Sequence, residues 1–331
     1  MVFLSVRLFG KPVVERAGKD LEGLHPSKAL ELFCYLLLHR HRVHSRETLA
    51  SLLWSESPTS VSRKYLRQAF WQLRLAVQSE ADSGPSRLLV VDRDSVRLDP
   101  RLKLWLDVDV FERAAAEVQG MAGEQLGAAE ARVLADAVSL YRGDLLEGWY
   151  FDWCLCERER LQSTFILLLD KLMASAETTT QYEKGMAYGE VILRYDRARE
   201  RTYQRMMRLQ CLAGDRGGAI RQFQRCVAAL DQELGVRPSR QTLEILDEIR
   251  ADKLAKTVLL PTSQATEKSN ATVRESPRFV SSLARLHQLR NLLVTVQRRI
   301  QQDIRAVDQA LSKRSSFKPS LDVPDSKENH H

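Results

Sequence analysis

The sequence predicts a mainly α-helical protein in which only the N-terminal third contains short strands. Three observations predict this class. Residues 1–104 alternate strand-like and helix-like hydrophobic spacing, residues 105–255 place apolar side chains at helical spacing almost throughout, and residues 278–314 predict one long amphipathic helix. Residues 256–277 are rich in polar residues and predict a linker, and residues 315–331 have the composition of a disordered tail.

The first expected elements are two short strands and a helix. Leu4, Val6 and Leu8 alternate along an extended segment, and the Gly-Lys-Pro turn at residues 10–12 reverses the chain into a second strand. A helix is expected from about residue 27 to 39, with an apolar face that consists of Leu30, Phe33, Leu36 and Leu37.

Two further helices and a second hairpin complete the N-terminal part. Ser45 is a suitable N-cap for a second helix, and a third helix is expected at residues 60–78. After a Ser-Gly-Pro break, the apolar runs 88–91 and 96–98 flank a polar turn and predict a β-hairpin. This hairpin region carries three arginines: Arg87, Arg93 and Arg97.

The helix at residues 60–78 has two chemically different faces. Projected at 100° per residue, its apolar side chains cluster within about 100° and predict the buried face: Leu66, Ala69, Phe70, Leu73 and Val77. The opposite face carries Lys64, Arg67, Gln68, Trp71 and Gln72, and its flanks carry Arg63 and Arg74. No acidic residue occurs between Ser57 and Ser79.

This face has the chemistry of a DNA-reading helix. Arg, Lys and Gln side chains can reach base edges or phosphate oxygens in a major groove, and the lack of carboxylates avoids repulsion from the phosphate backbone. A solvated basic face is the alternative that the helix alone leaves open. The order helix-helix-helix-hairpin favours DNA, because in a winged helix-turn-helix the third helix enters the major groove and the hairpin reaches the backbone or minor groove. We therefore predict that residues 1–104 bind duplex DNA, with Arg93 as a further contact.

The charge distribution agrees with this division. The net charge of +7 consists of +6 for residues 1–104, −5 for residues 105–255 and +6 for the remainder. A basic N-terminal part suits a polyanion, and an acidic middle part suits other partners.

Several ordered motifs resemble the Streptomyces antibiotic regulatory protein family. They are residues 30–40, 43–49 and 66–74 in the N-terminal part, and the Leu-Tyr-Arg-Gly-Asp-Leu-Leu sequence at 140–146, Trp153, 157–161, 213–216 and 233–238 in the middle part. The resemblance covers roughly residues 1–250. It implies an OmpR-type winged helix followed by a tetratricopeptide-like bacterial transcriptional activator domain. It also implies a protein that activates promoters by binding direct repeats near the −35 region and contacting RNA polymerase.

A weak internal repeat supports a helical-repeat domain. Ala187 and Val191 correspond to Ala219 and Phe223 at an offset of 32 residues, where small side chains would let paired helices pack closely. In the same region, a run of arginines is a candidate site for an anionic ligand: Arg194, Arg197, Arg199 and Arg201. The alternative is ion pairing of this run with Glu190, Asp196 and Glu200.

The helix expected at residues 278–314 carries apolar residues at alternating spacings of three and four. They form the seam of a predicted coiled coil that would join two copies of the chain: Phe279, Leu283, Leu286, Leu293, Ile300, Ile304, Val307 and Leu311. The alternative is that this helix folds back on the helical domain of its own chain.

Other constellations predict no catalytic or metal site. His39, His41 and His44 lack a Cys pair to complete a metal site and are interpreted as a basic solvated turn that touches phosphate. Cys154 and Cys156 lie among aromatic residues that indicate core packing. No phosphate-binding loop or nucleophile motif is present. We expect no enzyme activity and no cofactor, and the lack of a signal peptide or apolar membrane span predicts a cytoplasmic protein.

Overall fold

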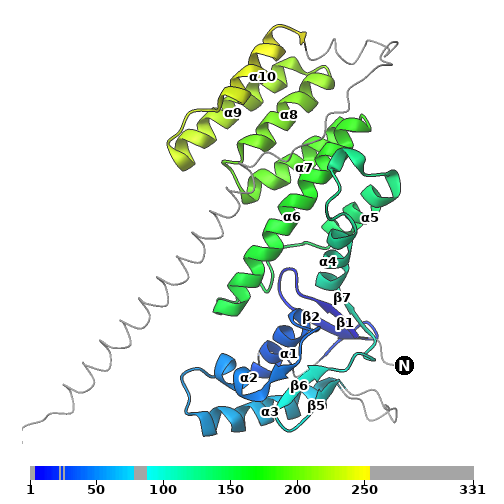
Figure 1. The fold of residues 1–331 in the computed structure, drawn as a ribbon, viewed down its shortest axis with the longest axis vertical. Coiled ribbons are helices and arrows are strands. Elements are labelled where there is room, and N and C mark those ends of the chain that lie inside the picture. Colours follow the sequence, from blue (N-terminus) through cyan, green and yellow to red (C-terminus); the bar gives the residue numbers. More distant parts are fainter. Residues whose placement is uncertain (1–3, 22–23, 25–26, 78–87, 254–331) are drawn as a thin grey trace, which may run out of the picture. The chain divides into compact units, whose positions relative to one another are not determined.

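The computed structural model describes residues 4–21, 24, 27–77 and 88–253 (Figure 1). The predicted linker, the predicted coiled-coil helix and the tail lie outside the described residues, as does Arg87.

The N-terminal part begins with a small sheet. Strands β1 (Leu4–Arg7), β2 (Val13–Arg16), β3 (Lys19–Asp20) and β7 (Leu104–Leu106) form the order β3-β2-β1-β7. The predicted antiparallel pair is confirmed, with Val6 opposite Val14. The fourth strand, β7, pairs parallel with β1. Strand β7 therefore crosses the predicted boundary between the two domains, which lies between residues 104 and 105.

Three helices follow as predicted. Helix α1 (Lys28–Leu38) begins after Ser27, whose hydroxyl accepts the Leu30 N–H at 3.3 Å, and it buries its whole predicted apolar face. Helix α2 (Arg46–Leu53) begins after Ser45, whose side chain accepts from two N–H groups of the first turn, so the predicted cap is confirmed. Helix α3 (Thr59–Val77) packs against both α1 and α2.

The predicted second hairpin is also confirmed. Strands β5 (Leu89–Val91) and β6 (Ser95–Leu98) pair antiparallel, and the short strand β4 (His44–Ser45) joins them in the order β4-β6-β5. We call the β5–β6 hairpin the wing. The first three helices and the wing have the order of a winged helix-turn-helix.

The remaining described residues form a helical domain, coloured from teal-green to yellow in Figure 1. Its elements are α4 (Asp107–Glu117), the short 3-10 helix η1 (Gly123–Gln125), α5 (Ala128–Ser139), α6 (Asp152–Thr178), α7 (Tyr182–Tyr195), α8 (Glu200–Leu212), α9 (Arg216–Leu234) and α10 (Arg240–Arg250). Consecutive helices pack in pairs, α6 on α7, α7 on α8 and α8 on α9, as in a tetratricopeptide array.

The repeat is present, but the predicted offset of 32 residues is wrong. Helix α7 begins at Tyr182 and α9 at Arg216, an offset of 34, which is the tetratricopeptide period. The small residue that corresponds to the buried Ala219 is therefore Gly185, whereas Ala187 is exposed. A Cβ atom added at Gly185 would lie 2.8 Å from Leu209 Cδ1, so this position keeps α7 and α8 close.

Helix η1 packs tightly on α6 through Gly123. A Cβ added at Gly123 would lie 2.5 Å from the backbone oxygen of Lys171 and 2.6 Å from Ala174 Cβ. We expect Gly123→Ala to lower the free energy of unfolding by about 2 kcal/mol, because neither contact can rotate away. Gly217→Ala is the control, since its Cβ would meet only the Arg221 and Asp215 side chains. Denaturant unfolding checks both; equal stabilities of the two variants would contradict the close packing.

The Leu-Tyr-Arg-Gly-Asp-Leu-Leu segment joins the helical domain to the end of β1. Phe9 bridges Leu145, the Leu146 N–H donates to the Leu8 carbonyl at 2.9 Å, and the Gly10 N–H donates to the Asp144 carbonyl at 2.9 Å. Aromatic contacts continue the connection, and Phe9 lies 4.6 Å from the Tyr141 ring centre. This motif, which the sequence singled out, therefore holds the winged helix to the helical domain.

The buried carboxylate of Asp107 lies at the same junction. It begins α4 and accepts the N–H of Leu8 at 2.8 Å and of Phe9 at 3.0 Å. Burial raises its pKa, against the opposing effect of these backbone donors. The Asp107 carboxylate thus accepts hydrogen bonds from two backbone N–H groups that directly follow β1 and would otherwise be buried without a partner.

Candidate nucleic-acid interface

The two faces of α3 are as the sequence predicts. Leu66, Ala69, Leu73 and Val77 are buried, whereas Phe70 is half-buried because it lines a cleft described below. The predicted DNA-facing side chains are all exposed: Arg63, Lys64, Arg67, Gln68, Trp71, Gln72 and Arg74. Trp71 exposes 63% of its surface, which is unusual for an indole that could pack in a core.

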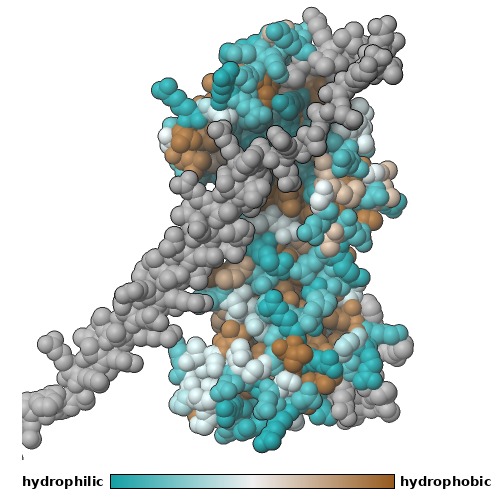
Figure 2. All heavy atoms as spheres, viewed as in Figure 1, coloured by the Kyte–Doolittle hydropathy of each residue, from teal (hydrophilic) through white to brown (hydrophobic). Residues whose placement is uncertain are grey.

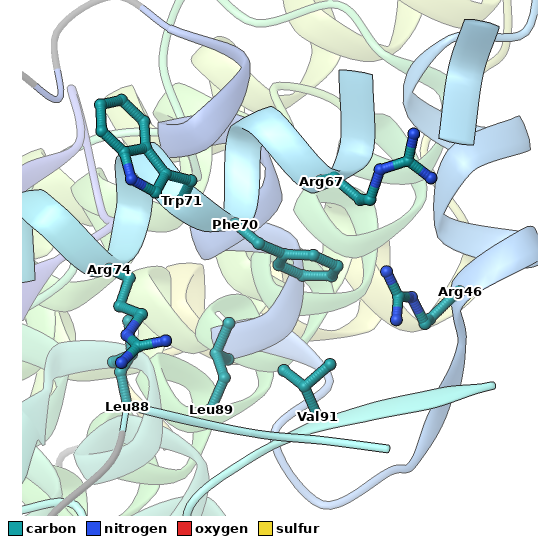
Figure 3. A pocket seen from close by; sticks show the side chains of 8 residues that line it. All are labelled: Arg46, Arg67, Phe70, Trp71, Arg74, Leu88, Leu89 and Val91. Atoms are coloured by element: carbon teal, nitrogen blue, oxygen red, sulfur yellow. The ribbon is translucent and has the colours of Figure 1, made fainter. Parts of the chain in front are cut away.

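A cleft of about 470 Å³ separates α3 from the wing (Figure 3). Its floor is apolar, with Phe70 from α3 facing Leu88, Leu89 and Val91. Three guanidinium groups surround this floor, those of Arg46, Arg67 and Arg74, and Arg46 lies over the Phe70 ring at 5.9 Å. Figure 3 shows Trp71 pointing away from Phe70.

A second cleft, of about 390 Å³, lies between α2, α3 and the tip of the wing. It collects the predicted Arg63, Arg67 and Arg93 beside Arg46. Glu47 also lines it and forms an exposed salt bridge with Arg63 at 3.2 Å. Arg67 has no ion-pair partner among the described residues, so its charge is available to a ligand. The structure therefore brings five of the predicted residues to two adjoining clefts, whereas Lys64, Gln68 and Gln72 are exposed and line neither.

Arg46 is the residue that sequence reasoning missed. It lines both clefts, and its N–H donates to the Asp94 carbonyl at 3.0 Å, which ties the start of α2 to the tip of the wing. The N-cap at Ser45 could have indicated this residue, because it makes Arg46 the first residue of α2. Arg46 then directly follows β4, the strand that pairs with β6 of the wing.

The interpretation of the three histidines as one solvated turn is wrong for two of them. His39 and His44 are half-buried, and the His44 Nε2–H donates to the His39 carbonyl at 3.2 Å. Both rings pack on Tyr35, which in turn contacts Trp153 of α6 at 5.4 Å. His41 alone is exposed. These rings serve the contact between the winged helix and the helical domain.

Acid is expected to weaken this contact. Burial lowers the pKa of His39 below its ordinary value of 6.5, so the unfolded chain binds this proton more readily than the folded chain. The contribution is intact above pH 6.5 and is lost as the pH falls through the lowered folded-state pKa. Urea unfolding of wild type and His39→Gln between about pH 7.5 and about pH 5.5 measures this effect. An equal pH slope in both proteins would contradict the burial argument.

The arginine run does not form one site. Arg199 pairs with Asp196 as the sequence suggests, at 3.9 Å, whereas Arg197 pairs with Glu233 and Arg201 with Asp170. Arg194 and Arg197 line a cleft of about 510 Å³ with Tyr203 and Arg225. Arg199 and Arg201 do not line it, so only half of the predicted set converges.

The cysteines and metal-binding side chains show no further site within the part of the chain that the structure describes. Cys154 is buried, Cys156 is exposed, and Cys34, Cys211 and Cys226 are buried. No three His, Cys, Asp or Glu side chains are grouped to hold a metal ion among the described residues. No helix in the described ranges is long and apolar enough to cross a membrane.

The described residues thus form a winged helix-turn-helix fold joined to a tetratricopeptide-like helical domain, and α3 exposes a basic face. Residues 106–250 match the family model of the bacterial transcriptional activator domain, and the helical domain is such a domain. This match confirms the bacterial transcriptional activator domain that the predicted resemblance implies for the middle part of the chain.

A solved structure supports the same fold. The chain is similar to Mycobacterium tuberculosis EmbR in complex with a low-affinity phosphopeptide, with a TM-score of 0.64 and 20% identity over 78% of this chain and 69% of that chain. The search of curated proteins found no match.

Proposed function

We propose that this chain is a sequence-specific DNA-binding transcriptional regulator. The observation that carries the proposal is the exposed, acid-free face of α3 together with the two arginine-lined clefts beside it. Long cationic and amide side chains project from this helix, while the wing supplies a second contact surface. The helix carries Arg63, Lys64, Arg67 and Arg74 and no carboxylate, which suits the phosphate backbone of a duplex.

Each group of residues has a proposed role. Lys64, Arg67, Gln68, Trp71 and Gln72 face the major groove, where they contact base edges and the apolar thymine methyl group. Arg46, Arg63, Arg74 and Arg93 hold phosphate oxygens on either side of the groove.

The helical domain contacts protein rather than DNA. Its net charge of −5 disfavours a position along the phosphate backbone. Following the resemblance, we propose that the regulator is a cytoplasmic activator, that it binds direct repeats near a promoter, and that this domain contacts RNA polymerase. The predicted seam at residues 279–311 would join two copies of the chain, and each copy would then bind one of the two direct repeats.

A ligand-gated regulator is the second candidate. The cleft lined by Arg194, Arg197, Tyr203 and Arg225 gathers three guanidinium groups in about 510 Å³, although Glu190 already pairs with Arg225 at 2.6 Å. A thermal-shift screen of the full chain against nucleotides tests it. A shift that is absent from Arg194→Ala/Arg197→Ala supports gating, and no shift with any nucleotide contradicts it.

Selection from a random duplex library tests the main proposal. We expect the full chain to enrich a defined motif and to bind it at least 10³-fold more tightly than unrelated duplex. The alternative, a repeat-domain adaptor whose winged helix binds only protein, predicts that no motif is enriched.

A further inference from the structure

A third cleft on the winged helix takes no part in the proposed reading of DNA. It has a volume of about 490 Å³ and lies between the loop after α1, the end of β6 and strand β7. Arg40 and Asp109 also line it, and their salt bridge at 2.7 Å joins that loop to α4 of the helical domain. The cleft is therefore placed where the two domains meet.

The floor of this cleft is apolar and incompletely covered. Leu98 and Leu106 are buried, and Leu102 and Leu104 are half-buried at its base. Val43 forms one wall and exposes 63% of its surface. On the face that Figure 2 draws, most of the described surface is hydrophilic, and one of the hydrophobic patches lies on the part that holds the winged helix. Apolar surface in a concave site of this size is typical of small-molecule pockets.

The rim of the cleft is cationic. Arg42, Arg97 and His41 are exposed around it. No salt bridge or side-chain hydrogen bond joins the Arg42 or Arg97 guanidinium to another described residue.

The two carboxylates that line the cleft are already neutralised. Asp99 accepts two bonds from the Arg101 guanidinium at 3.1 Å and one from the Arg101 N–H at 2.9 Å, and this partner holds the pKa of Asp99 below its usual range. Asp109 is held by Arg40 and by Arg113, each at 2.7 Å. The cleft thus presents an apolar base and uncompensated positive charge at its rim.

We propose that this cleft binds a small amphipathic acid, with its apolar body on the leucine floor and its anionic group between Arg42 and Arg97. A phosphodiester backbone would bury little apolar surface on the leucine floor. An acyl or aromatic body would contribute about 25 cal/mol of binding free energy for each Å² of apolar surface that it buries. The rim guanidinium groups then supply charge-assisted hydrogen bonds to a carboxylate or another anionic group. Because the site touches both domains, its ligand stabilises their junction by binding the folded chain alone. This inference does not depend on DNA binding.

Three probes of matched chain length test the proposal on the full chain. Decanoate, decan-1-ol and decyltrimethylammonium share an apolar body and differ in charge. Below micelle-forming concentrations, we expect decanoate to raise the unfolding temperature in a saturable way. We also expect it to displace the fluorescent dye 8-anilinonaphthalene-1-sulfonate at a concentration about tenfold lower than decan-1-ol needs. The cationic probe should bind more weakly than decan-1-ol.

Two variants locate the site. Arg42→Ala/Arg97→Ala should lower the affinity for decanoate about tenfold and leave the affinity for decan-1-ol unchanged. Leu102→Asn should lower the affinity for both probes. Arg237→Ala/Arg240→Ala removes two exposed charges elsewhere and serves as the control. Equal binding of all three probes, unchanged decanoate affinity in the rim variant, or equal weakening in the control would overturn the proposal. So would a rim variant that loses affinity for duplex DNA but keeps decanoate, since the cleft would then be a phosphate contact.

Discussion

The variant Lys64→Ala/Arg67→Ala is expected to bind its selected duplex about 100-fold more weakly than wild type. Both side chains lie on the exposed face of α3, one turn apart, and Arg67 also faces both clefts beside the wing. Each base or phosphate contact of this kind contributes about 1–3 kcal/mol, and two such losses multiply to this factor. Fluorescence anisotropy at one fixed salt concentration measures the ratio.

A matched control separates a local contact from a general effect of charge. Arg237→Ala/Arg240→Ala removes the same number of positive charges from exposed positions in the activator domain, so we expect its affinity to stay within about twofold of wild type. If the two double variants lost affinity equally, the long-range field of the protein would account for binding, and the assignment of α3 to the groove would be wrong.

Asp107→Ala is expected to lower the free energy of unfolding by about 3 kcal/mol. The substitution removes the acceptor for the N–H groups of Leu8 and Phe9, which are buried where β1 enters the domain junction. Each buried donor left without a partner costs about 1–3 kcal/mol. Urea unfolding followed by circular dichroism measures the loss.

Two further variants define the origin of that loss. Asp107→Asn keeps one acceptor oxygen but turns an amide N–H₂ toward backbone donors, so its stability should fall between those of wild type and Asp107→Ala. Asp136→Ala changes an exposed aspartate and should cost less than about 0.5 kcal/mol. A loss in Asp107→Ala no larger than in Asp136→Ala would mean that other groups hold the junction.

Local features of the winged helix could be predicted from the sequence because they depend on neighbouring residues. The hydroxyl of Ser45 caps α2, the polar turn at residues 92–95 closes the wing, and the spacing of apolar residues gives the buried face of α3. Phe70 departs from that pattern only because the wing leaves a cleft beside it.

Features that depend on distant parts of the chain could not be predicted. The pairing of β7 with β1 joins residues about 100 positions apart, and nothing in either strand specifies its partner. His39 packs on Tyr35, whose ring contacts Trp153 of the helical domain, and the role of Arg46 depends on where the wing lies. The true repeat offset depends on which small residue faces a neighbouring helix, and the residue spacing alone matched Ala187, rather than the residue that packs on α8, with Ala219.

The salt dependence of DNA binding tests the central claim most directly. If α3 and the arginine-lined clefts hold phosphates, the logarithm of the association constant for the selected duplex should fall linearly with the logarithm of salt concentration. The expected slope is about −0.9 for each phosphate contacted, or about −4 for contacts by Arg46, Arg63, Arg74 and Arg93. Removing Arg74 should make the slope shallower by about 1. An affinity that does not change with salt, in wild type and variant alike, would contradict the account.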